Sequence, residues 1–137
     1  MGSKSDYLEN AILDGVLGGP AFSLPGSVYV GLWTGTLNDA STGATAGEVS
    51  GGGYTRATVA NGTANWPTAA SGAKANGGTI SFPTASADWG TVGYWGILDA
   101  SGTAANMLYW GALTTSKVVS NGDTARFNPG DLDITED

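Results

Sequence analysis

Turn-forming residues interrupt this chain so often that they limit the regular elements it can form. Glycine occupies 23 of the 137 positions, and beyond residue 17 the apolar runs between Gly, Pro, Asn and Ser are short. β-Branched and aromatic residues fill these runs, as in residues 28–33, which favours strands. We therefore predict an all-β fold, an antiparallel β-sandwich of the jelly-roll kind with one short N-terminal helix. The length fits a single domain, 1–137, with the sandwich over 28–134.

Residues 6–17 form the one segment with clear helical periodicity. Asp6 can act as the N-cap with Glu9 three residues later, and Gly18-Gly19-Pro20 ends the segment. Its apolar stripe consists of Leu8, Ile12, Leu13, Val16 and Leu17. The stripe needs a partner surface, which is either the sheet of the same domain, the alternative we favour, or a neighbouring molecule.

Two stretches are too polar and too rich in small residues to form strands. Residues 34–53 contain only Leu37 and Val49 as large aliphatic residues, and the second stretch holds Trp66 among small residues. We expect 34–53 to be a long surface loop, whose length a contact with a neighbouring molecule would explain, although a mobile loop would look the same. Trp66 is expected to be exposed or interfacial. The predicted interface residues are Leu8, Ile12, Leu37, Val49 and Trp66.

The clearest hairpin pattern lies in the C-terminal half. Residues 91–99 and 106–113 flank a turn-rich segment, and both arms contain the sequence Tyr-Trp-Gly. Folding at this turn would place Trp95 roughly opposite Trp110, and this aromatic pair would fix the register. The glycine after each tryptophan predicts crowding by a neighbouring ring or backbone.

The composition removes most catalytic designs. The chain has no Cys and no His, which excludes thiolate and imidazole chemistry and the usual zinc clusters. Paired carboxylates remain possible, but Asp88, Asp99 and Asp123 all lie at predicted turns, where a short carboxylate caps backbone amides. The acidic C-terminal end, residues 131–137, has no calcium-loop spacing. We predict no catalytic or metal-binding residues and no cofactor.

The charge also restricts the partners. Twelve acidic and five basic residues give a net charge of −7, which disfavours nucleic acid and anionic membranes as partners. No apolar run reaches the length of a membrane span, and the N-terminus lacks the pattern of a signal segment. Only 12% of the residues are charged. Such a surface suits contact with other proteins.

The five tryptophans raise a second hypothesis, because aromatic faces can stack on sugar rings. Trp33, Trp95 and Trp110 lie inside apolar strand patterns and are expected in the core, which leaves Trp66 as the best candidate. A carbohydrate-binding β-module is therefore an alternative function.

A series of segments resembles, in order, a family of small virion proteins of tailed bacteriophages. The segments are residues 3–10 (SKSDYLEN), 28–34 (VYVGLWT), 48–56 (EVSGGGYTR), 80–83 (ISFP), 89–92 (WGTV), 96–100 (GILDA), 108–111 (LYWG) and 122–124 (GDT). The resemblance thus spans nearly the whole chain. One departure is Gly93-Tyr94-Trp95, where a smaller or more polar pair is expected before the next glycine.

The resemblance implies a non-enzymatic structural protein of the virion. Members are commonly described as tail fibre proteins, but a domain of this size also suits a capsid decoration or cement protein, which is the role we expect. Such a protein would bind copies of itself and the major capsid protein or another virion protein. Because closed rotational symmetry is the rule for homo-oligomers and capsids offer threefold positions, a trimer is the expected state.

Overall fold

The computed structural model describes residues 2–136 and shows one short helix and nine strands there. The elements are β1 (Gly2–Lys4), α1 (Asp6–Val16), β2 (Ser27–Trp33), β3 (Ala57–Ala60), β4 (Ala73–Ala75), β5 (Ile80–Ser81), β6 (Gly90–Leu98), β7 (Met107–Val119), β8 (Arg126–Phe127) and β9 (Asp133–Thr135). The predicted all-β class with a single N-terminal helix is confirmed.

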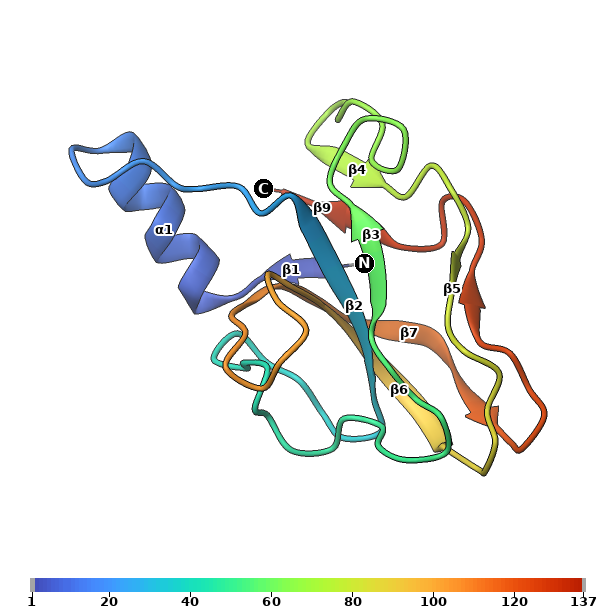
Figure 1. Cartoon of the computed structure of the whole chain (residues 1–137). Helices are drawn as coiled ribbons and strands as arrows, with labels where there is room; N and C mark the ends of the chain where they lie inside the picture. The colour runs from blue at the N-terminus through green and yellow to red at the C-terminus, as the bar shows by residue number, and fades with distance from the viewer. Residues whose placement is uncertain (1, 137) are drawn as a thin grey trace.

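Seven strands form one curled sheet in the order β3-β2-β6-β7-β1-β9-β4, and β5 and β8 pair separately as a two-stranded ribbon (Figure 1). Every pairing is antiparallel except that of β1 with β9. The two layers expected of a sandwich are therefore unequal, with the curled sheet on one side and the short ribbon on the other. A register shift between Val92 and Tyr94 interrupts the β6–β7 ladder, and such irregularities increase strand bending.

The alternation of side chains along the strands divides the core into two clusters. On β2, Val28, Val30 and Leu32 point to the larger cluster, which includes Phe82 and Phe127 near the ribbon. Trp33 on the same strand belongs to a smaller cluster on the opposite face of the sheet. The period of two along a strand therefore buries both faces of the sheet centre.

The β6–β7 hairpin forms as predicted, but its register differs. Trp95 lies opposite Gly111 and Gly96 lies opposite Trp110, so the two tryptophans are not a cross-strand pair. Trp95 faces the larger cluster, whereas Trp110 packs against the smaller one beside Tyr94, with ring centroids 6.4 Å apart. A shift of one residue reverses the face that a side chain occupies.

The predicted crowding at the glycines is confirmed for Gly96. A Cβ atom added there would lie 2.8 Å from Met107 Cε and 3.1 Å from the Trp33 ring.

Candidate interaction surfaces

The five predicted interface residues lie in very different environments. Leu8, Leu37, Val49 and Trp66 are all buried in the core of the subunit, with at most 7% of the residue exposed. The expectation that Trp66 is exposed is therefore wrong, and these four side chains present little surface to another molecule. Ile12 is 37% exposed and is therefore accessible to a partner.

The segment 34–53 contains no strand, as expected, but it is packed against the body of the protein. Leu37 completes the smaller core cluster with Trp33 and Met107. Trp33 Nε1 donates to the carbonyl of Thr45 at 3.1 Å. Val49 enters the larger cluster, and its N–H donates to Leu32 O at 3.0 Å. The two large aliphatic residues of this segment therefore anchor it internally.

Arg56 connects the same segment to the hairpin turn, through an ion pair with Glu48 and hydrogen bonds to carbonyls of the turn. Arg56 Nε and Nη2 each donate to Glu48 carboxylate oxygens at 2.7 Å, and its remaining donors reach the carbonyls of Gly43, Ala100 and Gly102. Tyr54 Oη also donates to Glu48, at 2.8 Å. The hydrogen bonds with Glu48 raise the pKa of Arg56. The sequence did not predict this network. Its only signal there is that Arg56 is one of just five basic residues in the chain.

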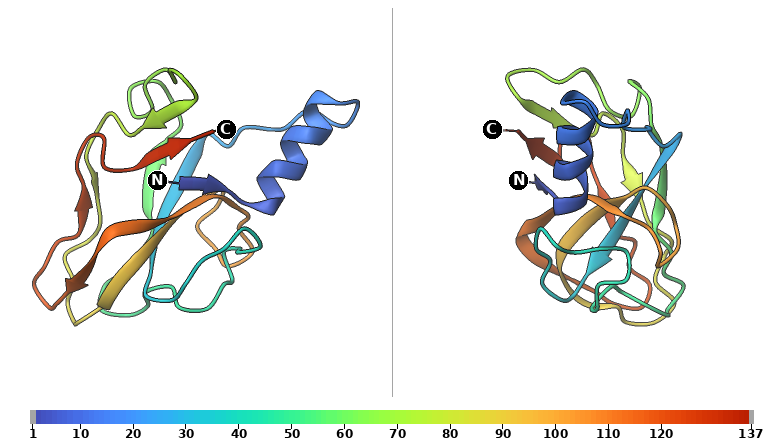
Figure 2. Two further views of the ribbon diagram at one scale, coloured as in Figure 1. Left: turned by 180° about the vertical axis from the view of Figure 1, so that it is seen from behind. Right: turned by 90° about the vertical axis from the view of Figure 1, so that its left-hand side faces the viewer.

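By contrast, residues 6–26, which we call the arm, project from the sheet (Figures 1 and 2). Ser5, not Asp6 as predicted, is the N-cap of α1, because its Oγ accepts a hydrogen bond from Leu8 N and donates to Met107 O. Asp6 begins the first turn, where its charge interacts favourably with the helix dipole. Leu8 is the one buried residue of α1. The arm is thus fixed to the sheet at its base.

The helix ends just before Gly18-Gly19-Pro20, as the sequence predicted. Gly18 has a φ of +87°, which suits glycine, and the N–H of Gly19 returns to Asp14 O. From here the chain runs back to β2 (Figure 1).

The outer part of the arm exposes its apolar stripe. Leu13, Val16 and Leu17 are 57%, 73% and 76% exposed, so beyond Leu8 the stripe does not pack on its own sheet, contrary to the expectation. Leu24, on the returning segment, is also exposed. Since complete burial of one such side chain stabilises by about 1.5–3 kcal/mol, covering the outer stripe would contribute on the order of 3–6 kcal/mol before the cost of association. This is the main unpartnered apolar surface on α1.

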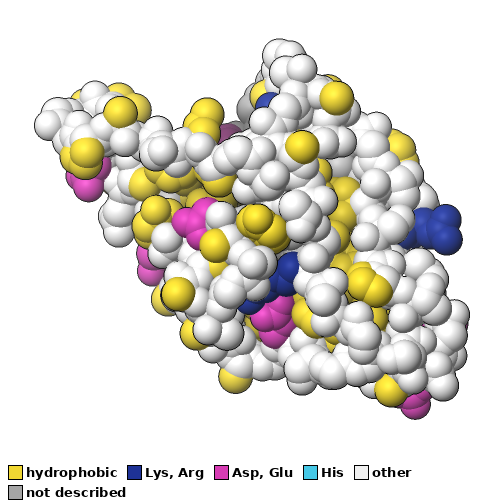
Figure 3. Space-filling model, in the orientation of Figure 1, with side chains coloured by type: hydrophobic (Ala, Val, Ile, Leu, Met, Phe, Trp, Pro, Cys, Tyr) yellow, Lys and Arg dark blue, Asp and Glu magenta, His cyan; other side chains and the backbone are white. Residues whose placement is uncertain are grey.

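A hollow of about 410 Å³, which we call the arm groove, lies between the arm and the sheet. One wall is the base of the arm, with Leu8, Phe22 and Leu24, and the floor includes Ile97 and Leu108. The opposite wall is formed by the segment around Trp66 and β4. Apolar side chains cover this region between the arm and the body in Figure 3.

Polar residues also line the arm groove, among them Asn61, Lys74 and Glu136, and two polar groups of the lining lack a partner among residues 2–136. Trp66 Nε1 is buried and has no hydrogen-bond partner among residues 2–136. Lys74 lines the groove and has no ion-pair partner in that range, whereas Lys4 is paired with Glu136, which raises the pKa of Lys4. The lining of the groove therefore includes an ammonium group without an ion-pair partner and a tryptophan whose buried N–H has no acceptor, both among the described residues.

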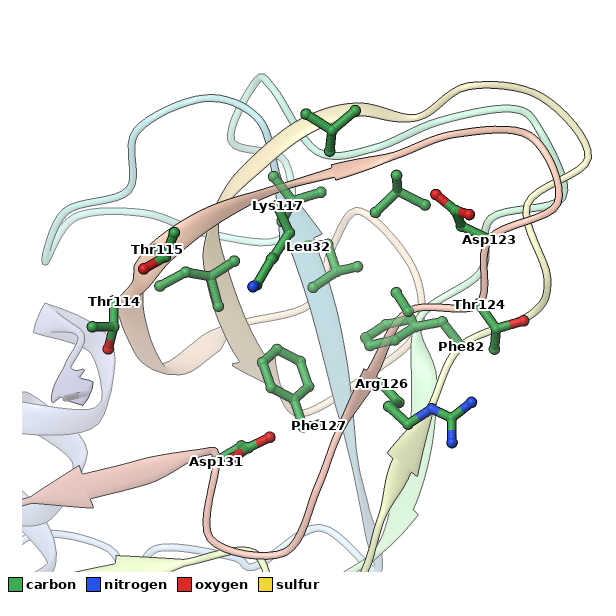
Figure 4. A pocket seen from close by; sticks show the side chains of 15 residues that line it. Leu32, Phe82, Thr114, Thr115, Lys117, Asp123, Thr124, Arg126, Phe127 and Asp131 are labelled. Carbon is green, nitrogen blue, oxygen red and sulfur yellow. The ribbon is translucent and has the colours of Figure 1, made fainter.

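A second and larger hollow, about 610 Å³, separates β7 from β8 (Figure 4). Its floor is apolar, with Leu32, Phe82 and Phe127, and Lys117 points into it. Asp123 and Asp131 on its rim each accept a backbone N–H, from Ser120 and Asn128 respectively. The rim carboxylates therefore brace their own loops.

The other candidate polar residues are also engaged in turns. Asp88 accepts from Asn121 N and Asp99 from Asn106 N, both at 2.8 Å, as a turn role requires. In the acidic C-terminal end, Glu136 pairs with Lys4, and Asp137 lies outside the described residues. No group of three or more metal-ligating side chains occurs among residues 2–136. Within that range, no helix is long and apolar enough to cross a membrane.

The tryptophans do not form an open stacking platform of the kind that the sugar hypothesis needs. Trp33, Trp66, Trp89 and Trp95 are buried. Trp110 is half-buried and donates through Nε1 to Asp39 at 3.0 Å.

The chain was compared with models of known protein families. The model of a family described as "Podophage GP4 fiber I protein gp80" matches residues 3–135. No curated protein matches the chain.

Proposed function

The chain belongs to the podophage GP4 fiber I protein family, and we propose that it acts as a fibre-type structural subunit that assembles through its arm, without catalysis. Membership makes it a virion component with a phage structural role. The resemblance read from the sequence to small virion proteins of tailed phages is confirmed.

The observation that carries the proposal is the exposed apolar stripe of the arm. A helix that presents Leu13, Val16 and Leu17 to solvent gains free energy when a partner covers it. Segment 34–53, the other candidate for an assembly contact, buries its two large aliphatic residues in its own subunit. Assembly through the arm accounts for a helix that contributes one buried side chain to its own subunit.

The partners we propose are copies of the same chain and another virion protein. A head-to-tail contact between arm and body generates a ring when the rotation closes, and a trimer is the state we expect. Attachment of that ring to a second virion protein would then place it on the particle.

Capsid decoration, the role expected first from the sequence, is a competing proposal for the location. The low charge and small-residue surface suit a protein that makes many contacts on a capsid, with the major capsid protein as partner. The family description favours a fibre. Copy number separates the two, because a decoration protein covers the head in hundreds of copies.

Labelling of purified phage particles with gold-coupled antibody tests the location. Label on the fibres and a low copy number per particle are expected for the fibre role. Label distributed over the head would contradict it and support decoration.

Light scattering after size-exclusion chromatography tests the assembly through the arm. The wild-type chain should form an oligomer, and Val16→Asp should be monomeric with an unchanged far-UV circular dichroism spectrum. Val118→Asp is the matched control, since Val118 is 67% exposed but lies on β7 outside the arm. An oligomer that survives Val16→Asp would contradict the role of the arm.

A further inference from the structure

We infer that the acceptor for the arm is the arm groove of a second copy of this chain. The inference rests on the proposed self-association and specifies the surface that receives the arm. Its starting point is that the apolar arm and the apolar groove lie side by side on one molecule but do not fill one another.

The geometry requires two copies. The base of the arm already forms one wall of the groove, through Leu8 and Phe22, while the tip residues Leu13, Val16 and Leu17 do not line it. The arm leaves the sheet at Ser5 and projects away from it (Figure 2). The tip of an arm thus reaches a groove only when it comes from a neighbour, whose helix would then also pack beside the arm of the receiving copy.

Charge complementarity supports the same occupant. Residues 6–26 contain three carboxylates, Asp6, Glu9 and Asp14, and no basic residue. The C-terminal end of α1 also carries the negative end of the helix dipole, with no basic side chain in its last turn. Two charged residues line the groove: Glu136, which is already paired with Lys4, and Lys74, which has no ion-pair partner among the described residues. An arriving helix C-terminus with Asp14 would supply one.

The buried Trp66 Nε1 is a second and independent sign that the groove is incomplete. Trp66 is more than nine-tenths buried, lines the groove, and its N–H has no acceptor within residues 2–136. Buried N–H groups are paired in most structures. A small shift of the groove wall around an inserted helix end would give this donor one of the backbone carbonyls after Asp14, since those of Leu13 and Asp14 already accept from Leu17 N and Gly19 N.

Cross-linking of single-cysteine variants tests the contact, and the absence of Cys from the chain makes it clean. Val16→Cys labels the arm tip and Ala73→Cys labels the groove wall. Mixing the two variants and adding a short bismaleimide should give a cross-linked dimer containing one copy of each. Thr115→Cys, on the exposed part of β7, replaces Ala73→Cys in the control mixture and should give only background.

A charge test uses Lys74 and Lys117, one in each hollow, neither of which has an ion-pair partner among residues 2–136. Lys74→Glu should raise the dissociation constant for self-association about tenfold, the equivalent of roughly 1.4 kcal/mol. Lys117→Glu makes the same charge change in the other hollow and should leave the constant within about twofold. The double variant Asp14→Lys/Lys74→Glu should recover most of the affinity.

The outcomes distinguish the two levels of the proposal. If the wild-type chain is monomeric at every concentration, both the self-association and the arm groove contact are wrong. If it is oligomeric but the mixture yields only Val16→Cys pairs, arms meet arms and the groove is not the acceptor. Equal effects of Lys74→Glu and Lys117→Glu would likewise overturn the groove as acceptor.

Discussion

Segment 34–53 and the arm are two excursions from the same sheet, and they are held in opposite ways. Segment 34–53 is polar and rich in glycine, yet Leu37 and Val49 anchor it in the two core clusters and Arg56 ties it to the hairpin turn. The arm is the better hydrophobic segment by pattern, yet beyond Leu8 its stripe lies in solvent. The apolar content of a segment therefore does not indicate how firmly it is held.

The difference shows what each segment can contribute to assembly. A segment fixed by an internal ion pair and two buried aliphatic residues gives a rigid surface, but it has no large apolar side chain left to insert into a partner. A helix that is fixed only at its base keeps its apolar side chains available. We therefore place the assembly contact on the arm and treat 34–53 as part of the supporting body.

The largest expected effect on this comparison comes from Arg56→Met. The substitution removes four hydrogen-bonding partners of the guanidinium and leaves Glu48, whose side chain is only 18% exposed, without its counter-charge. Loss of one partner of a buried pair costs about 3–5 kcal/mol, and the partial exposure of Glu48 places this case near 3. Urea denaturation measures it. Arg126→Met, an exposed arginine, should change stability by less than about 0.5 kcal/mol.

Leu37→Ala should have the next largest effect. The side chain is 2% exposed in the smaller cluster, so its truncation leaves a cavity and should cost about 2–4 kcal/mol in the free energy of unfolding. Leu24→Ala, an exposed leucine of the arm, is the matched control and should cost far less in the monomer. Similar losses for the two variants would show that 34–53 is held no more firmly than the arm.

The sequence predicted local helices and strands better than it predicted which residues pack against one another in the fold. Periodicity located α1, β2 and the β6–β7 hairpin because these depend on spacing and turn residues within one segment. It did not reveal that Trp66 is buried, since its neighbours in the chain are small and the core cluster that it joins is built from distant segments. The one-residue shift between Trp95 and Trp110 also escaped, because the register depends on irregularities in the β6–β7 ladder. The exposure of the α1 stripe was not predictable either, because it depends on the direction in which the helix leaves the sheet after Ser5.

The pH dependence of stability should also report on how segment 34–53 is held, because the partly buried Tyr54 donates to Glu48 in that segment. Burial raises the pKa of Tyr54 well above its ordinary value of 10.0, and burial raises that of Tyr109 as well. A group whose pKa is higher in the folded state stabilises the fold below the unfolded pKa, and this contribution is lost as the pH rises above it. Unfolding free energy should therefore fall above pH 10, by about 1 kcal/mol per pH unit for Tyr54.

Urea denaturation at pH 8 and pH 11 measures this loss. Tyr54→Phe should be less stable at pH 8, because it loses the hydrogen bonds with Glu48 and Leu32, but should decline less between the two pH values. Tyr7→Phe, in the exposed arm, should leave the wild-type decline unchanged. An unchanged decline in Tyr54→Phe would show that Tyr54 is not the group responsible.

The smallest expected effect is the most informative about the arm. Leu13→Gln keeps a good helix-forming residue at a position that is 57% exposed, so the free energy of unfolding of the monomer should change by no more than about 0.5 kcal/mol. Denaturation at a protein concentration where the chain is monomeric measures this value, and the same experiment at high concentration should show a larger loss for Leu13→Gln. That increase with concentration follows because an oligomer stabilises the folded state by mass action. A loss of 2 kcal/mol or more in the monomer would mean that the stripe packs on its own subunit, and the contrast between the arm and segment 34–53 would disappear.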